Sequence, residues 1–297
     1  MKIRSHLLFL VLGTLLPILA FSAAMTAVFW REQRQALEQR FVDRVRGMTI
    51  ALDREIDGNI RSLQMLAESP HLQSNDLLSF HEQIMRARST QSTWANIILS
   101  DPVSGRQVIN LRYPFGKPLP ETLIDKSTLS SVVKSGRPFV APISQVRVGG
   151  NYMTTIVVPA KTGSGRPYTL MAVIDPSSWL HFLSNYPVAT DATLTLLDQN
   201  GIIIARTLNS ERWVGQLPAE GLTLQARKAP EGSSITQGLE GQWFYTAHSR
   251  SKLAGWTLAS GVPKEGVEAA LRQSVLLMVA GVAATAILAI TLAGVFG

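Results

Sequence analysis

Six side chains between residues 112 and 175 are of types that bind small polar molecules. They are Arg112, Tyr113, Arg147, Tyr152, Thr154 and Asp175. A guanidinium can hold a carboxylate through two parallel hydrogen bonds, so Arg112 and Arg147 suit a small organic anion. Tyr113 and Tyr152 offer apolar walls with a hydroxyl group, and Asp175 can receive an amine. A structural interpretation competes with this one, because arginines beside turns are mostly solvated and a tyrosine in a strand usually belongs to the core.

Catalytic, metal-binding and cofactor-binding patterns are missing from the sequence. It contains no cysteine, and its five histidines do not have the spacing of metal ligands. It has no nucleophile elbow, phosphate-binding loop or dinucleotide fingerprint. The net charge of +7 comes without a basic run, which argues against a nucleic-acid partner. We therefore expect no catalytic residues, no metal and no cofactor in this chain.

Two apolar segments enclose the candidate residues. Residues 7–30 and 274–297 contain no ionisable side chain, and each could cross a hydrocarbon core of roughly 30 Å at about 1.5 Å per helical residue. The first could be a signal peptide, but its length favours an uncleaved anchor. Basic residues flank it on both sides, so the positive-inside rule is indecisive. We expect a multi-pass membrane protein with residues 31–271 outside the cytoplasm.

Residues 31–69 have the pattern of one long amphipathic helix. Its apolar residues recur at steps of three or four, as a helix requires. They are Leu37, Phe41, Val45, Met48, Leu52, Ile56, Ile60, Leu63 and Leu66. Two interpretations of this stripe remain open: it packs on the chain's own domain, or it forms the seam of a homodimer. A second helix is expected at residues 76–91.

The pattern beyond residue 92 is that of a small α+β module. Strands are predicted at 94–100 and 106–112, a helix at 121–134, and further strands at 138–145, 152–159 and 167–174. A helix at 176–186 leads into a partial repeat, in which residues 192–206 restate the first hairpin and 255–263 echo 167–176. The sequence therefore predicts two related modules with antiparallel sheets.

The order of short motifs resembles the double Cache family of extracytoplasmic sensors, which carry two PAS-like modules behind a long helix. The resemblance rests on Leu99-Ser100-Asp101 with Gly105, Ser135-Gly136-Arg137-Pro138, Val157-Val158-Pro159-Ala160, Leu197-Asp198-Gln199-Asn200-Gly201 through Arg206, Glu211-Arg212-Trp213-Val214-Gly215, and Ser249-Arg250-Ser251 through Gly255-Trp256 to Gly261-Val262-Pro263.

The resemblance to the double Cache family implies an α+β fold with a long N-terminal helix and two tandem PAS-like antiparallel-sheet modules, flanked by two transmembrane helices. The expected divisions are a cytoplasmic tip and first span (1–30), the stalk and second helix (31–92), a membrane-distal module with its joining helix (93–186), a membrane-proximal module (187–271) and the second span (272–297).

The resemblance also implies a function. The motifs look most like the ligand-binding input portions of bacterial two-component histidine kinases, so we expect a homodimeric sensor in the inner membrane whose kinase lies outside this chain. Its partners would be the lipid bilayer and a small molecule, with a small organic anion as the candidate. Amino-acid-binding members carry an Arg-x-Trp-Tyr-type motif of which this sequence has no clean copy. Sensors of diguanylate cyclases or chemoreceptors, and a membrane-anchored adaptor that binds no small molecule, remain alternatives.

Overall fold

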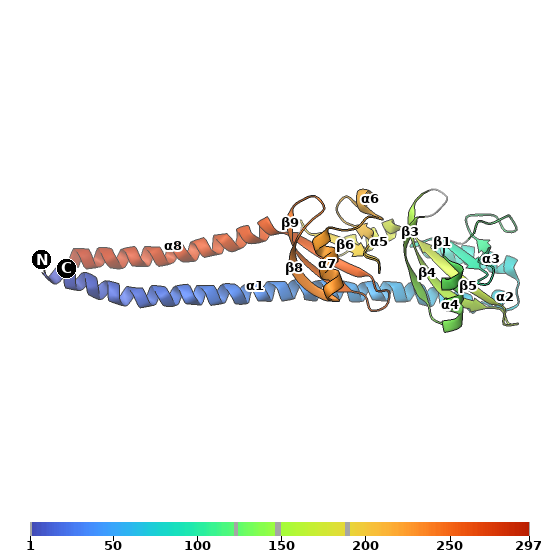
Figure 1. The fold of residues 1–297 in the computed structure, drawn as a ribbon, viewed down its shortest axis with the longest axis horizontal. Helices are drawn as coiled ribbons and strands as arrows, with labels where there is room; N and C mark the ends of the chain where they lie inside the picture. The colour runs from blue at the N-terminus through green and yellow to red at the C-terminus, as the bar shows by residue number, and fades with distance from the viewer. Residues whose placement is uncertain (1, 122–123, 146–149, 188–190, 297) are drawn as a thin grey trace.

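The computed structural model describes residues 2–121, 124–145, 150–187 and 191–296. It is an elongated molecule in which two sheets follow one another along a long helix (Figure 1). This helix, α1 (Lys2–Ala67), runs from the N-terminus past both sheets, and α8 (Lys264–Phe296) returns from the last strand beside it. Both termini therefore lie at the end of the molecule away from the sheets. Within the described residues, no helix combines the length and the apolar character needed to cross a membrane.

The first sheet, which we call the distal sheet, has five antiparallel strands in the order β2-β1-β5-β4-β3. The strands are β1 (Trp94–Ser100), β2 (Gln107–Asn110), β3 (Phe139–Gln145), β4 (Tyr152–Lys161) and β5 (Pro167–Ile174). Three helices accompany them: α2 (Pro70–Gln73), α3 (Leu77–Thr90) and α4 (Lys126–Ser135). The strands lie where the sequence predicts them, with β2 shorter and β4 longer than expected.

The second sheet, the proximal sheet, repeats this topology in the order β7-β6-β10-β9-β8. Its strands are β6 (Thr193–Leu197), β7 (Ile203–Arg206), β8 (Glu231–Gln237), β9 (Trp243–Arg250) and β10 (Thr257–Pro263). The helices are α5 (Pro176–Ser184) between the sheets, then α6 (Ser210–Trp213) and α7 (Glu220–Lys228). The α+β fold with a long helix and two antiparallel sheets is therefore confirmed.

The main core lies between α1 and the two sheets. Leu52, Ile56 and Leu63 of α1 are fully buried there, together with alternate residues of the central strands. Complete burial of each such side chain stabilises the fold by about 1.5–3 kcal/mol. The apolar stripe thus packs on the chain's own domain from Val42 to Ala67, which is the first of the two interpretations left open by the sequence.

The two modules also touch each other directly. The rings of Trp179 on α5 and Trp256 before β10 meet edge to face with centroids 5.0 Å apart. The carboxylate of Asp198 in the β6–β7 turn accepts a hydrogen bond from the backbone N–H of Ile143 on β3 at 3.2 Å, and burial raises the pKa of Asp198. Gln199 in the same turn donates to the carbonyl of Val140 at 3.2 Å. A turn of the proximal module is therefore docked against an edge strand of the distal sheet.

Candidate ligand-binding sites

The face of the distal sheet turned away from α1, which we call the distal outer face, is covered by α4. Because side chains alternate along a strand, every second residue of β1, β2, β4 and β5 lies on it. Its apolar members pack against Leu129 and Val132 of α4; they are Ile98, Met153, Val157, Met171 and Val173. The helix is held in place by Asp125, whose carboxylate accepts the backbone N–H of Thr128 at 2.9 Å, and it ends at the left-handed Gly136.

A chain of buried amides crosses this face. Asn96 Nδ2 donates to Asn110 Oδ1 at 2.9 Å, Asn110 Nδ2 donates to Gln107 Oε1 at 2.7 Å, and Gln107 Nε2 donates to the carbonyl of Glu121 at 3.2 Å. Two atoms of the face are left over: Asn96 Oδ1 and Ser100 Oγ are buried and have no hydrogen-bond partner among the described residues. An unpaired buried polar group costs about 1–3 kcal/mol, which makes both atoms candidates for a hydrogen bond to a ligand.

Two of the six predicted site residues lie beside this amide chain. The backbone N–H of Arg112 donates to Asn110 Oδ1 at 3.0 Å, and that of Tyr113 donates to the Asn110 carbonyl at 2.9 Å. The side chain of Arg112 is exposed and that of Tyr113 is half-buried. Arg147 lies outside the described residues. Ligand contact by these residues stays a prediction.

The other three predicted residues lie elsewhere. Thr154 is buried in the main core, where its hydroxyl accepts the indole N–H of Trp179 at 2.8 Å and donates to the carbonyl of Ile174 at 3.3 Å. Asp175 caps α5 by accepting the backbone N–H of Ser177 at 2.8 Å. Tyr152 packs against Gly215 of the proximal module. The structure does not bring these three together with Arg112 and Tyr113.

Asn96, Ser100, Gln107 and Asn110 were not among the predicted site residues. The sequence pattern places them only in the first hairpin. A signal was available, because Asn is disfavoured in strands and here lies on the same face as buried apolar residues. An amide in such a position needs a partner, and that requirement marks it as a candidate site residue.

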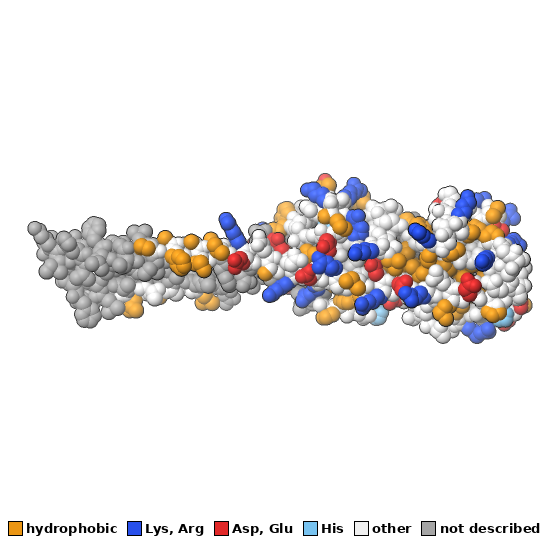
Figure 2. Space-filling view, turned by 90° about the horizontal axis from the view of Figure 1, so that it is seen from below, with side chains coloured by type: hydrophobic (Ala, Val, Ile, Leu, Met, Phe, Trp, Pro, Cys, Tyr) orange, Lys and Arg blue, Asp and Glu red, His pale blue; other side chains and the backbone are white. Residues whose placement is uncertain are grey.

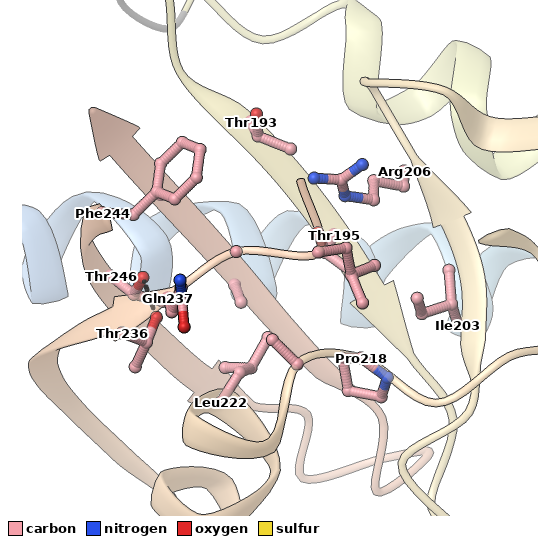
Figure 3. A pocket seen from close by; sticks show the side chains of 15 residues that line it. Thr193, Thr195, Ile203, Arg206, Pro218, Leu222, Thr236, Gln237, Phe244 and Thr246 are labelled. Atoms are coloured by element: carbon pink, nitrogen blue, oxygen red, sulfur yellow. Dashed lines mark hydrogen bonds between the residues drawn. The ribbon is translucent and has the colours of Figure 1, made fainter. Parts of the chain in front are cut away.

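A second candidate site lies on the corresponding outer face of the proximal sheet, beneath α7. It is a cavity of about 50 Å³ bordered by threonines of β6, β8 and β9, by Leu222 and Phe244, and by Arg206 (Figure 3). The Arg206 side chain is only 5% exposed and makes two short hydrogen bonds to the carboxylate of Glu240, in the β8–β9 turn. Mainly because of these bonds, the pKa of Glu240 falls to about 2. In the described ranges, no group of His, Asp and Glu side chains is arranged to hold a metal ion.

Acid should weaken this pair. A folded-state pKa of about 2, against an ordinary 4.5, means that Glu240 stabilises the fold above pH 4.5 and loses this contribution as the pH falls toward 2. At neutral pH, the unfolding free energy of wild type should exceed that of Glu240→Gln by on the order of 2 kcal/mol. This figure is smaller than the full pKa shift implies, because solvent partly screens the pair. Because a protonated glutamate resembles glutamine, urea unfolding at stepped pH should show the two proteins converging near pH 2. A difference that does not change with pH would contradict this.

Comparisons with known proteins give structural but not sequence relatives. No family model matches the chain, and no curated protein matches it in sequence. The ligand-binding domain of the Pseudomonas fluorescens chemoreceptor CtaA, solved with L-isoleucine, is similar in structure, with a TM-score of 0.60 and 13% identity over 80% of this chain and 97% of that one.

Two further solved domains have the same architecture. The extracellular domain of rpHK1S-Z16, a protein assigned as a histidine kinase, has a TM-score of 0.52 and 15% identity over 80% of this chain and 97% of its own. The periplasmic sensory domain of the Campylobacter jejuni chemoreceptor Tlp1 has a TM-score of 0.57 and 11% identity over 78% and 96%. The chain therefore has the fold of these extracellular and periplasmic sensor domains of histidine kinases and chemoreceptors, the double Cache architecture that its sequence motifs resemble.

Proposed function

We propose that this chain is the extracytoplasmic ligand-sensing input portion of a transmembrane receptor, a two-component sensor histidine kinase of the bacterial inner membrane. The observation that carries the proposal is the pair of unpaired buried atoms, Asn96 Oδ1 and Ser100 Oγ, on the distal outer face. A protein that only needed a stable core would be better served by apolar residues there. The fold shared with sensor domains supports the same assignment.

The ligand that suits this face is a small organic acid that also carries hydrogen-bond donors. Asn96 Oδ1 can only accept a hydrogen bond, so the ligand must present an N–H or O–H group to it. Arg112 lies nearby, joined to the amide chain through Asn110, and its exposed guanidinium, which has no hydrogen-bond partner among the described residues, can hold a carboxylate. An amino acid or a hydroxy acid has both features. The similar domain of CtaA was solved with L-isoleucine, which has this chemistry.

Two buried hydroxyls test the proposal by substitution. Ser100→Ala removes an unpaired hydroxyl and should raise the unfolding free energy by about 1–3 kcal/mol, whereas Thr154→Val removes a paired one and should lower it by about 1–3 kcal/mol. Thermal-shift assays on the full chain in nanodiscs, with pools of amino and hydroxy acids, should find a stabilising pool. Ser100→Ala and Arg112→Ala should lose at least half of that ligand-induced shift. An unchanged shift in both variants would refute the site, and the same assay on Arg147→Ala tests its predicted contact.

Membrane anchoring through residues 7–30 and 274–297 is part of the proposal. Large apolar side chains are exposed along the helical pair, including Phe21 and Met25 on α1 and Leu277 and Ile287 on α8. Figure 2 shows apolar side chains among the described residues of this part, whereas charged side chains are spread over both modules. Such an apolar surface is what a helix presents to lipid.

In spheroplasts, a cysteine at the exposed Glu68 should react with a membrane-impermeant maleimide and one at Lys2 should not; the reverse pattern would contradict the orientation.

Signalling would proceed by a shift between two arrangements of α1 and α8 in a homodimer. The core side of α1 is occupied by the sheets, so its exposed side, with Gly47, Ile50 and Gly58, is available to a second copy. A ligand can bias such an equilibrium only by its different affinity for the two states. Cysteines at Ile50 should give symmetric crosslinks in native membranes. A chemoreceptor input domain is the second candidate, favoured by the likeness to CtaA and Tlp1.

A further inference from the structure

Glu240 occupies a carboxylate-binding site that the proximal module builds from three segments. Arg206 Nη1 and Nη2 on β7 donate to Glu240 Oε1 and Oε2 at 2.6 and 2.7 Å. Asn209 Nδ2 and the indole N–H of Trp213 donate to Oε1 at 3.4 and 3.2 Å. A bidentate guanidinium supplemented by neutral donors is the arrangement by which proteins recognise the carboxylate of a ligand.

The guanidinium of this site also faces an empty space. It borders the cavity of about 50 Å³ and points toward Thr193 and Thr195, with Phe244 on the opposite side (Figure 3). Besides the two bonds to Glu240, the Arg206 guanidinium donates only to the carbonyl of Leu208 at 2.7 Å, so among the described residues Nε and one N–H of Nη2 have no acceptor. The cavity holds about four water-sized volumes, which matches a chain of two or three carbon atoms.

The segment that carries Glu240 is a short turn at the edge of the sheet. The turn is closed by hydrogen bonds from Gly238 to Gln242 at 2.7 Å and from Gly241 to Gly238 at 3.0 Å, and these bonds do not involve the Glu240 side chain. That side chain is 23% exposed, whereas Arg206 is almost completely buried. The carboxylate can therefore leave toward solvent by rotation of its own side chain, while the guanidinium stays fixed in the module.

We infer that the proximal module is a second ligand site, for a short monocarboxylate whose carboxylate replaces Glu240 on Arg206 and whose carbon chain enters the cavity. Glu240 acts as a tethered competitor. The apparent affinity equals the intrinsic affinity multiplied by the fraction of molecules in which Glu240 has left Arg206. Wild type should therefore bind the monocarboxylate weakly, and removal of the Glu240 carboxylate should tighten binding. This site does not depend on the distal outer face.

The test uses the full chain in nanodiscs, with propionate as the probe and propionamide as its uncharged match, followed by saturation-transfer NMR and calorimetry. Wild type should bind propionate saturably at millimolar concentration, and Glu240→Gln should bind it at least about tenfold more tightly. The double variant Arg206→Lys/Glu240→Gln should lose this gain, because lysine cannot form the bidentate pair. Propionamide should not bind to wild type or to either variant. Ser100→Ala should bind propionate as wild type does, which separates this site from the proposed distal one.

Two outcomes would overturn the inference. If wild type shows no saturable binding at tens of millimolar propionate although Glu240→Gln binds it, Glu240 is a permanent structural partner of Arg206. If Glu240→Gln binds no more tightly than wild type, the cavity does not accept the carboxylate. Should Glu240→Gln fail to fold, Glu240→Ala takes its place, because it also removes the tethered carboxylate, and the same two outcomes apply.

Discussion

Replacing Gly215 with alanine is expected to cost about 3 kcal/mol of unfolding free energy and to loosen the junction between the modules. The backbone at Gly215 has a φ of +81°, which strains any residue with a β carbon by about 1–2 kcal/mol. The added β carbon would in addition lie 2.1 Å from Cζ of Tyr152 and 2.4 Å from its Cε1 and Cε2. The ring of Tyr152, on β4 of the distal sheet, would have to move away from the proximal module.

Gly201 provides a matched control for this prediction. Its φ is also +81°, but a β carbon there would meet no described atom within 4 Å. Gly201→Ala should therefore show only the backbone strain, about 1–2 kcal/mol, in urea unfolding of the full chain. Truncating the ring in Gly215→Ala/Tyr152→Ala should remove the steric part of the penalty, as measured by a double-mutant cycle. Equal costs for Gly215→Ala and Gly201→Ala would contradict the packing of Tyr152 on the proximal module.

Leu52→Ala is the second substitution with a large expected effect, about 3–4 kcal/mol of unfolding free energy. Leu52 is fully buried on the side of α1 that faces the sheets, so truncation leaves a cavity in the core shared by both modules. Met65 lies further along the same helix and is 78% exposed. Met65→Ala should change stability by no more than about 0.5 kcal/mol. Comparable costs for the two, in the same denaturation experiment, would mean that α1 packs through a different face.

The elements of the fold could be predicted because their signals are local and periodic. The helical spacing from Val45 to Leu63 reappears as the buried stripe of α1, and the strand expected at 94–100 is β1 (Trp94–Ser100). The start of α4 was predicted too early, at 121 instead of Lys126. Glu121 lies in extended backbone bridged to Arg106, and the helix begins only after Asp125, whose side chain caps it. A capping signal thus decided the boundary against a good helix-forming residue.

The candidate sites were less accessible to sequence reasoning, because they depend on which way each side chain points. Thr154 and Thr155 are neighbours on β4, yet one faces the main core and the other lies on the distal outer face. Only the register of the sheet decides which of the two threonines faces the core. The contacts of Tyr152 with Gly215 and of Arg206 with Glu240 join residues far apart in the chain, and no local sequence pattern predicts them. Residue type alone therefore proposes Arg112 and Tyr113, whose ligand contact stays a prediction, and misses the amide chain beside them.

The most direct test of the sensing site is hydrogen–deuterium exchange of the full chain in nanodiscs, with and without pools of amino and hydroxy acids. Binding on the distal outer face should slow exchange in peptides that cover β1, β2 and α4, since Asn96 and Ser100 lie on β1, their amide chain continues on β2, and α4 packs on the same face. The same pool should leave these peptides unchanged in Ser100→Ala. No protection in β1, β2 and α4 with any pool, or protection confined to the proximal module, would contradict ligand sensing by the distal module.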